Sequence, residues 1–437
     1  MSQSQGFVFS KTFPLSLQIA IALILAVIVG ILLGGGNPNA NLSELINHLI
    51  IPCNLVLKAL RALATPLIVL AILHGFLTVN IPGRSGRKLT VLLLTNTLMA
   101  IAIGLLVANV LQPGRWWSIT AQGAAVTHKT LDPWGLLQDI VPNSILQPLV
   151  DNNVIQLVFI ALAFGVVLRA IKTEQIGQQK EDYRPIEQLI TLLFETVMTI
   201  LKWVIALVPI AVFGIVAKTI ALQGLKPFIS LAAFVMAVLV GLLLQAIYYT
   251  ARVKFSSWVS PQRFLLGSSD ALLTAFSTAS STAAMPVTFQ VLMQKIGVRE
   301  SSASLGALVG SNFNNDGTAL YEAMSALFVG QLLGLHLSLP QQLMVVLTSI
   351  FASVGAAGIP EAGLVTMTLV FTSVGLPTQY IALLITVDWF LDRCRTAINV
   401  MGDITISCLL DGHKQHIEMP NISQETAYLP EDLSIDN

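Results

Sequence analysis

Long apolar segments without charged residues constrain this chain more than any other feature of its sequence. Five segments contain no Asp, Glu, Lys or Arg, and a sixth, residues 49–77, contains only Lys58 and Arg61. The five are residues 13–33, 89–112, 152–168, 203–217 and 227–251. A helix needs about 20 apolar residues to cross a hydrocarbon core about 30 Å thick. The first 260 residues are therefore predicted to cross a membrane six times.

Composition excludes the common alternatives to a membrane protein. Of the 437 residues, 11% are charged, whereas soluble domains carry about 25% charged residues. Lys plus Arg and Asp plus Glu both number 23, so no excess positive charge is available for nucleic acid. Cys53, Cys394 and Cys408 are too few and scattered for a disulfide framework or a structural zinc site. The first apolar segment exceeds the roughly 7–15 residues of a secretory signal core, so we interpret it as a span.

Basic residues in short loops predict the orientation of the spans. Lys and Arg cluster after the second, fourth and sixth segments, for example at Arg84, Arg169 and Arg252, and are absent from the loop after the first. Lys218 and Lys226, after the fifth segment, argue mildly for the opposite orientation. On balance, both termini are expected in the cytoplasm, with the chain in the inner or plasma membrane.

After residue 264, small residues interrupt the apolar sequence. SSTAAMPVT (residues 280–288) and ASVGAAGIPEAG (residues 352–363) are interpreted as tips of re-entrant hairpins, because non-helical backbone at membrane depth must be buried in protein or line a wet cavity. A helix-packing face of small residues is the alternative. Pro286 precedes Asn314 by 28 positions, and Pro360 precedes Asp388 by the same number. Paired interrupted segments in two halves of a chain are typical of secondary transporters.

The last long segment contains a polar stripe. Its members are spaced by 4, 3, 4 and 4 residues and fall within about 80° of a helix surface: Asp388, Asp392, Arg395, Asn399 and Asp403. One Asp or Arg at the bilayer centre costs about 2.5–3.5 kcal/mol. Mutual neutralisation of the first three residues is the alternative, but it does not account for the continuation to Asn399 and Asp403. The stripe is therefore interpreted as a binding site.

The motif NNDGT, which begins at Asn314, predicts a second site. Gly317 favours an unwound segment with free carbonyl oxygens, and Asp316 adds an anionic oxygen. Such oxygen ligands suit a hard monovalent cation. A helix N-cap inside a loop is the alternative interpretation.

Enzymes and channels are the competing classes. The sequence has no nucleophile elbow, paired-histidine metalloprotease motif or phosphate-binding glycine loop. The one histidine pair with ligand-like spacing, His413 and His416, lies in the polar tail. No enzymatic activity and no organic cofactor are expected. Opposite charges on one helix favour a zwitterionic substrate over the ion pore of a channel.

With these residues in view, the chain resembles the dicarboxylate/amino acid:cation symporters, the glutamate transporter family. Four motifs carry the resemblance in order: SSTAAMPVT, NNDGTALYEA, ASVGAAGIPEAGLV and DWFLDRCRTAINVMGD. The resemblance implies an all-α membrane protein with eight transmembrane helices, two re-entrant helical hairpins and a homotrimeric assembly. It also implies an elevator mechanism, in which a transport domain moves along a scaffold. The implied scaffold is residues 1–85 and 113–222, the implied transport domain is 86–112 and 223–410, and the cytoplasmic tail is 411–437.

The resemblance implies roles for individual residues. Arg395 matches the arginine that binds the side-chain carboxylate of the substrate, and a planar guanidinium suits that task. Asp392 matches the aspartate that binds the substrate ammonium. The other substrate matches are Asn399 and Ser281 for the α-carboxylate, Thr318 and Thr396 for polar contacts, and Gly358 in the lid at residues 357–360.

Sodium ligands follow from the same resemblance. Gly310, Asn314, Asn399 and Asp403 match one site, Asp316 with Asn96 and Thr97 matches a deeper one, and Ser353 matches a site under the lid. Asn315 replaces the methionine that the family usually has there, and Asn96 stands where a threonine is common. The number of coupled sodium ions is therefore left open.

Glu322 matches the position that carries a proton in acid-coupled animal members of the family. A satisfied buried carboxyl is the alternative. Arg393 resembles an arginine of the animal members and is expected to stabilise ionised Glu322 once the substrate leaves; whether a counter-transported potassium ion assists it is left open. The resulting hypothesis is a symporter of L-aspartate or L-glutamate with sodium and a proton, partnered by its own copies and the lipid bilayer. A proton-driven, sodium-independent symporter of acidic amino acids or C4-dicarboxylates is the alternative.

Overall fold

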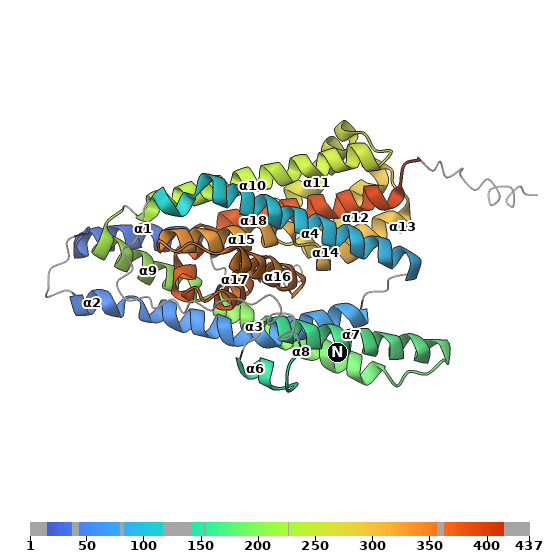
Figure 1. The fold of residues 1–437 in the computed structure, drawn as a ribbon, viewed down its shortest axis with the longest axis horizontal. Helices are drawn as coiled ribbons and strands as arrows, with labels where there is room; N and C mark the ends of the chain where they lie inside the picture. Colours follow the sequence, from blue (N-terminus) through green and yellow to red (C-terminus); the bar gives the residue numbers. More distant parts are fainter. Residues whose placement is uncertain are drawn as a thin grey trace, which may run out of the picture.

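The computed structural model of the protein describes residues 15–36, 43–78, 83–116, 141–151, 154–225, 227–355 and 362–414. Within these ranges the regular structure is entirely helical, as the sequence predicts. The long helices run roughly parallel to one another and form an elongated bundle (Figure 1). Gly358, in the predicted lid, and His416, in the tail, lie outside the described ranges.

The first half of the chain contains most of the long apolar helices. They and the short helices between them are α1 (Leu15–Leu33), α2 (Ser43–His48), α3 (Ile51–Thr78), α4 (Gly83–Leu111), α6 (Gln147–Asp151), α7 (Val154–Gly177), α8 (Arg184–Ile205), α9 (Val208–Gln223) and α10 (Pro227–Ser256). Among the described residues, α3, α4, α8 and α10 are long and apolar enough to cross a membrane, and α1, α9 and α16 are shorter apolar helices. The count of eight spans stays a prediction.

The fifth predicted segment differs from the observed helices. Residues 203–217 were expected within one span, but α8 ends at Ile205 and α9 begins at Val208. Pro209 lies in the first turn of α9, where its missing N–H is tolerated. The same proline would remove a hydrogen bond from the interior of a continuous helix, so the helix breaks just before it.

The second half contains broken and paired helices. They are α11 (Pro261–Thr278), α12 (Ser281–Val291), the π-helical η3 (Leu292–Ile296), α13 (Glu300–Ala303), the π-helical η4 (Ser304–Val309), α14 (Gly310–Phe313), α15 (Asp316–Leu332), α16 (Leu339–Gly355), α17 (Ala362–Ser373) and α18 (Ile381–Asp411). Helix α11 contacts α12, and α16 contacts α17, so each pair forms a helical hairpin. Both hairpins were predicted from the small-residue stretches.

The tip of the first hairpin is closed by local backbone geometry. Ala279 adopts a left-handed conformation with φ of 50°, which reverses the chain after α11. Ser280 then caps α12, because its hydroxyl oxygen accepts a hydrogen bond from the N–H of Ala283 at 3.2 Å. The tip thus places Ser281 in the first turn of a helix, buried in the protein.

The long helices lie in two layers, and the polar residues lie within one of them (Figure 1). Helices α4, α10, α15 and α18 lie in one layer, and α3, α7 and α8 lie in the other, with α16 and α17 between them (Figure 1). Helix α18 contacts α4, α10, α11, α12, α15 and α17. Its polar stripe is therefore enclosed by other helices, and all five members are at most 7% exposed.

Candidate functional site

The site begins where the helical backbone is interrupted. Helix α14 ends at Phe313, Asn314 after it is extended (φ −96°, ψ 94°), and α15 begins at Asp316. Gly317 follows, and a Cβ there would lie 2.7 Å from the carbonyl oxygen of Arg395. Only glycine allows α15 to approach α18 this closely. The helix is interrupted within NNDGT as predicted, but at Asn314 and Asn315, whereas Gly317 lies in the first turn of α15 and serves the close helix contact.

A fully buried arginine lies at the centre of the stripe. Nη1 of Arg395 donates to Asp388 Oδ1 at 2.9 Å, and Nη2 donates to Asp392 Oδ1 at 2.7 Å. The guanidinium carbon also lies 4.0 Å from the ring centroid of Tyr321, which is a cation–π contact. At Gly363 of α17 a Cβ would approach the guanidinium to 3.0 Å. The second hairpin therefore borders the arginine directly.

Asn399, one turn further along α18, joins the helix to the interruption. Its Oδ1 accepts from the N–H of Gly317 at 2.8 Å, and its Nδ2 donates to Asn315 Oδ1 at 3.2 Å. Nδ2 also lies 3.4 Å from the hydroxyl of Thr318. Asn315 is thus a direct partner of Asn399, which the sequence flagged only as a departure from the family.

The first predicted sodium cluster is brought together. Nδ2 of Asn314 donates to Asp403 Oδ1 at 2.9 Å and to the carbonyl oxygen of Asn399 at 2.8 Å. Gly310 packs so closely that a Cβ would lie 2.5 Å from Asp403 Oδ1. Oδ1 of Asn314 is buried and has no hydrogen-bond partner among the described residues. Buried carboxylate, amide and carbonyl oxygens are gathered here, as a cation site requires.

The deeper cluster joins three helices. Asp316 of α15 accepts a hydrogen bond from the Thr97 hydroxyl of α4 at 2.6 Å, and another from the Tyr249 hydroxyl of α10. Asn96 of α4 is fully buried, and its Oδ1 accepts from Nη1 of Arg252, also on α10. The sequence grouped Asp316, Asn96 and Thr97, but it missed Tyr249 and Arg252. Their spacing of three on one helix face was the available signal.

The remaining predicted residues take varied positions. The Ser281 hydroxyl donates to the carbonyl oxygen of Ser311 at 3.0 Å, and the Thr396 hydroxyl donates to that of Asp392 at 2.8 Å. Arg393 donates to the carbonyl oxygens of Phe276 and Ser277, at the end of α11. Ser353 lies in α16, but its side chain is outside the described part of the structure.

Glu322 lies in the core of α15 and is fully buried. The hydroxyl of Thr366, on α17, lies within hydrogen-bonding reach of its carboxylate. The charge that acts on it is that of Arg395, whereas the sequence assigned this role to Arg393. Arg393 is instead engaged by the first hairpin.

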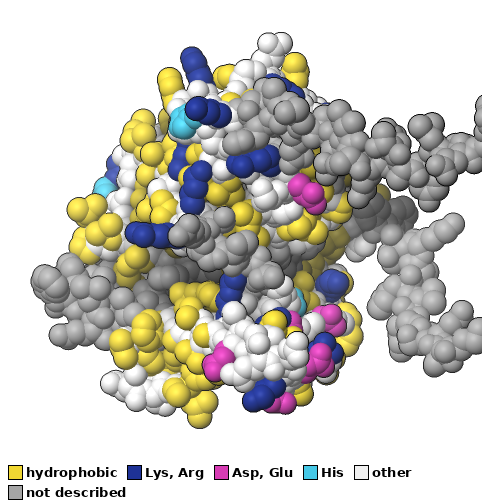
Figure 2. Space-filling model, turned by 90° about the vertical axis from the view of Figure 1, so that its right-hand side faces the viewer, with side chains coloured by type: hydrophobic (Ala, Val, Ile, Leu, Met, Phe, Trp, Pro, Cys, Tyr) yellow, Lys and Arg dark blue, Asp and Glu magenta, His cyan; other side chains and the backbone are white. Residues whose placement is uncertain are grey.

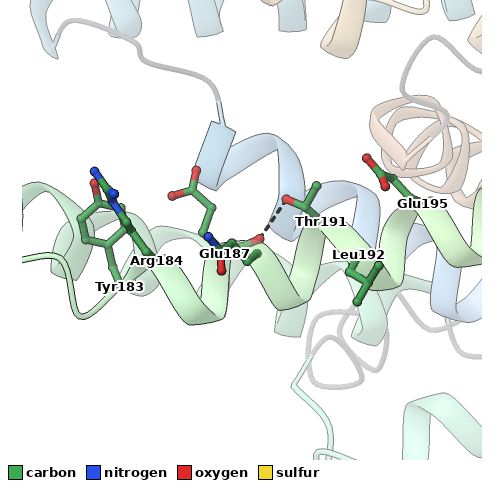
Figure 3. Close-up of a pocket in the computed structure, with 7 residues that line it drawn as sticks. Tyr183, Arg184, Glu187, Thr191, Leu192 and Glu195 are labelled. Carbon is green, nitrogen blue, oxygen red and sulfur yellow. Dashed lines mark hydrogen bonds between the residues drawn. The ribbon is translucent and has the colours of Figure 1, made fainter. Parts of the chain in front are cut away.

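An open hollow of about 510 Å³ lies elsewhere, along α8. Figure 3 shows Tyr183, Glu187 and Thr191 on one face of this helix, with the Thr191 hydroxyl bonded to the Glu187 carbonyl oxygen at 2.8 Å. Glu187 also pairs with Lys172 at 2.8 Å. These groups satisfy one another on the surface, and none belongs to the predicted site.

Charged and polar groups therefore meet inside a bundle whose outer helices are apolar and long enough to span a bilayer. This arrangement defines a polytopic helical membrane protein with an enclosed polar site beside broken helices. Residues 15–413 match the sodium:dicarboxylate symporter family, and the chain belongs to that family. The family is one of transporters, and its description implies sodium as a co-transported ion.

Animal relatives match most of the chain. It is 28% identical to excitatory amino acid transporter 3 of Mus musculus, over 95% of this chain and 89% of the relative. It is 30% identical to excitatory amino acid transporter 4 of the same organism, over 86% and 80% respectively. Over a shorter stretch, 57% of this chain and 45% of the relative, it is 35% identical to human excitatory amino acid transporter 1.

Proposed function

We propose that the protein is a secondary active symporter that takes up L-aspartate or L-glutamate together with sodium ions and a proton. The observation that carries this proposal is the fully buried guanidinium of Arg395, held between the carboxylates of Asp388 and Asp392. The relatives' names, which refer to excitatory amino acid transporters, support the same substrate class.

The charges of this centre complement an acidic amino acid. Such a substrate brings two carboxylates and one ammonium. Its side-chain carboxylate takes the place of Asp392 on Arg395, and Asp392 is then released to bind the ammonium. Arg395, Asp392, the side-chain carboxylate and the ammonium each keep an oppositely charged partner during this exchange, which avoids the penalty of several kcal/mol for an isolated buried ion. Asn399, Ser281, Thr318 and Thr396, with Gly358 of the lid, complete the proposed substrate site.

The proposed sodium ligands are the oxygen-rich groups beside this centre. They are Gly310, Asn314, Asn399 and Asp403 at one site and Ser353 under the lid. The resemblance adds a deeper cluster of Asp316, Asn96 and Thr97, to which Arg252 contributes a guanidinium. Glu322 is the proposed proton carrier, because a carboxyl buried away from water favours its neutral form. Its fully buried position within electrostatic reach of Arg395 supports this role.

The movement that we propose is an elevator. Residues 86–112 and 223–410 would carry the substrate along a trimeric scaffold of residues 1–85 and 113–222. The two layers of Figure 1 support this division, because α3 packs with α7 and α8, whereas α18 packs with α4, α10 and α15. Lys and Arg side chains gather at the end of the molecule with the α7–α8 and α10–α11 connections (Figure 2), which supports a cytoplasmic location of that end.

The decisive experiment uses purified protein in liposomes with imposed ion gradients. Labelled L-aspartate should accumulate when sodium is high outside, and uptake should saturate and prefer the L-enantiomer. Succinate should be a poor substrate, because it offers no ammonium to Asp392. Uptake that follows a proton gradient and ignores sodium would replace the proposal with the proton-driven alternative. Flux that neither saturates nor discriminates enantiomers would indicate a channel.

A further inference from the structure

We propose that the guanidinium of Arg252 is a built-in cation at the deeper site and takes the place of a sodium ion there. The inference rests on the proposed sodium-coupled function and deepens it, because it lowers the number of sodium ions that accompany each substrate. It gives a residue outside the four sequence motifs a role in ion coupling.

Arg252 reaches from α10 to α4. Its Nη1 donates to Oδ1 of Asn96, and its Nη2 donates to the hydroxyl oxygen of Thr95 at 2.8 Å. Asn96 is fully buried, so its amide oxygen faces the guanidinium and not water. An arginine side chain keeps its charge at all physiological pH values. The oxygen that Asn96 would offer to a sodium ion therefore already faces a permanent cation.

The carboxylate of the deeper site is also satisfied by the protein. Oδ1 of Asp316 accepts from Thr97 at 2.6 Å, and Oδ2 accepts from the hydroxyl of Tyr249. Asp316 is fully buried and needs a compensating positive charge. Among the described cationic groups, Arg252 is the one whose charge acts on Asp316. A sodium ion at the same place would face the guanidinium at close range.

The neighbouring cluster around Asp403 differs from the deeper site, because one of its buried oxygens is available to bind a cation. Oδ1 of Asn314 remains without a partner among the described residues, although the amide nitrogen of the same side chain binds Asp403. A buried oxygen is thus left for an incoming cation beside Asp403. Sodium coupling through this cluster is compatible with a deeper site that holds its own charge.

Arg252 enters the deeper site from the end of the bundle. It lies four residues before the end of α10, and its side chain is only partly buried. The guanidinium also lies 5.8 Å from the ring centroid of Tyr248, on the same helix, which restricts its orientation. Because this cation is covalently attached, it is not released to either side of the membrane. Each cycle should then move one fewer sodium ion than if a sodium ion occupied the deeper site.

The test compares the wild-type protein with Arg252→Met, which removes the charge but keeps a long side chain. Arg252→Lys retains a cation at the position, and Lys254→Met removes a charge from an exposed position on the same helix. Two quantities are measured at constant ionic strength. The first is the shift of the thermal midpoint of the substrate-free protein with sodium, and the second is the slope of log Kd for L-aspartate against log sodium concentration.

We expect Arg252→Met to bind one additional sodium ion. The slope of log Kd should then steepen by about one relative to the wild-type protein, and sodium should stabilise the substrate-free variant more strongly. Arg252→Lys and Lys254→Met should keep the wild-type values. Equal slopes and equal thermal shifts in the wild-type protein and Arg252→Met would overturn the inference.

Thr97→Ala tests the same point in a protein that retains Arg252, in case Arg252→Met does not fold. If sodium bound at the deeper site, loss of the Thr97 hydroxyl would weaken its stabilising effect. We expect the sodium-dependent thermal shift to stay unchanged, and its loss would overturn the inference. The thermal measurement requires no transport. Failure of the proposed function would appear separately, as a wild-type protein that does not accumulate acidic amino acids.

Discussion

Two buried charge clusters of this protein are assembled in different ways. Around Arg395, both partners, Asp388 and Asp392, come from the same helix as the arginine. Around Asp316, the partners Thr97 and Tyr249 come from two other helices. The ion pairs of the first cluster therefore lie within α18, and the second cluster exists only when α4, α10 and α15 are packed together.

This difference suits the two proposed tasks. A cluster on one helix allows a substrate to exchange partners with Asp392 while the surrounding helices stay in place. A cluster shared by three helices couples a charge to their relative positions. Substitutions in the first cluster should therefore change substrate binding, whereas those at helix contacts should change stability or ion coupling.

The largest effect should follow from removing the centre of the first cluster. Arg395→Cys leaves Asp388 and Asp392 buried without their cation, at a cost of about 3–5 kcal/mol. Uptake of L-aspartate into liposomes should fall by at least about two orders of magnitude. The shortened side chain leaves space for a neutral amino acid, so serine uptake should be measured in parallel.

Arg115→Cys provides the control for this substitution. Arg115 is exposed and contacts Gln112 and His336, so its loss should leave aspartate uptake at the wild-type level. Unchanged affinity for aspartate in Arg395→Cys would contradict the assignment of the substrate carboxylate to this arginine.

Asp392→Asn should separate the two kinds of substrate. The variant keeps the size of the side chain but loses the charge proposed to bind the ammonium. We expect aspartate affinity to fall by about 1.5–3 kcal/mol, the range for a hydrogen bond to a charged group. Succinate, which has no ammonium, should lose less. Competition of both compounds against labelled aspartate measures the ratio, and equal losses for the two would exclude a direct contact of Asp392 with the ammonium.

The same comparison shows what the sequence could predict. The stripe from Asp388 to Asp403 lies on one helix, so its spacing alone predicted that the side chains share a buried face. The interruption at NNDGT and the first hairpin tip at residues 280–288 were also visible, because glycine and small residues act locally. The all-α membrane fold followed from the apolar segments.

Local sequence patterns could not predict contacts between segments that lie far apart in the chain. Asn96 and Arg252 are separated by 156 positions, and Asp316 and Tyr249 by 67. No helical period connects such pairs. From the sequence alone, Arg252 was interpreted only as a basic residue after a span, which indicates the orientation of that span in the membrane. Pro209, by contrast, is a local signal for the break between α8 and α9, although the segment around it is apolar throughout.

A close helix contact can be tested at Gly310. A methyl group there would lie 2.5 Å from Asp403 Oδ1, so Gly310→Ala must displace the carboxylate or α14. Overpacking of this kind typically costs about 1–3 kcal/mol. We expect a lower thermal midpoint and weaker sodium-dependent stabilisation, measured in detergent. Gly177→Ala, at a position with open space around it, serves as the control. A Gly310→Ala protein with wild-type stability and sodium response would show that Asp403 does not need this contact.

The smallest effect on uptake is expected for Glu322→Gln. This substitution tests whether a third buried carboxyl takes part in the transport cycle. If Glu322 carries a proton with the substrate, acidification outside should raise wild-type uptake, because more molecules load the proton. Glu322→Gln resembles the protonated side chain at every pH, so its uptake should depend little on external pH.

Glu187→Gln, which removes a carboxylate from the surface pair with Lys172, should retain the wild-type pH profile. Initial rates across a series of external pH values, with the internal pH fixed, provide the measurement. Superimposable profiles for the wild-type protein and Glu322→Gln would leave Glu322 as a structural carboxyl and remove the proton from the proposed mechanism.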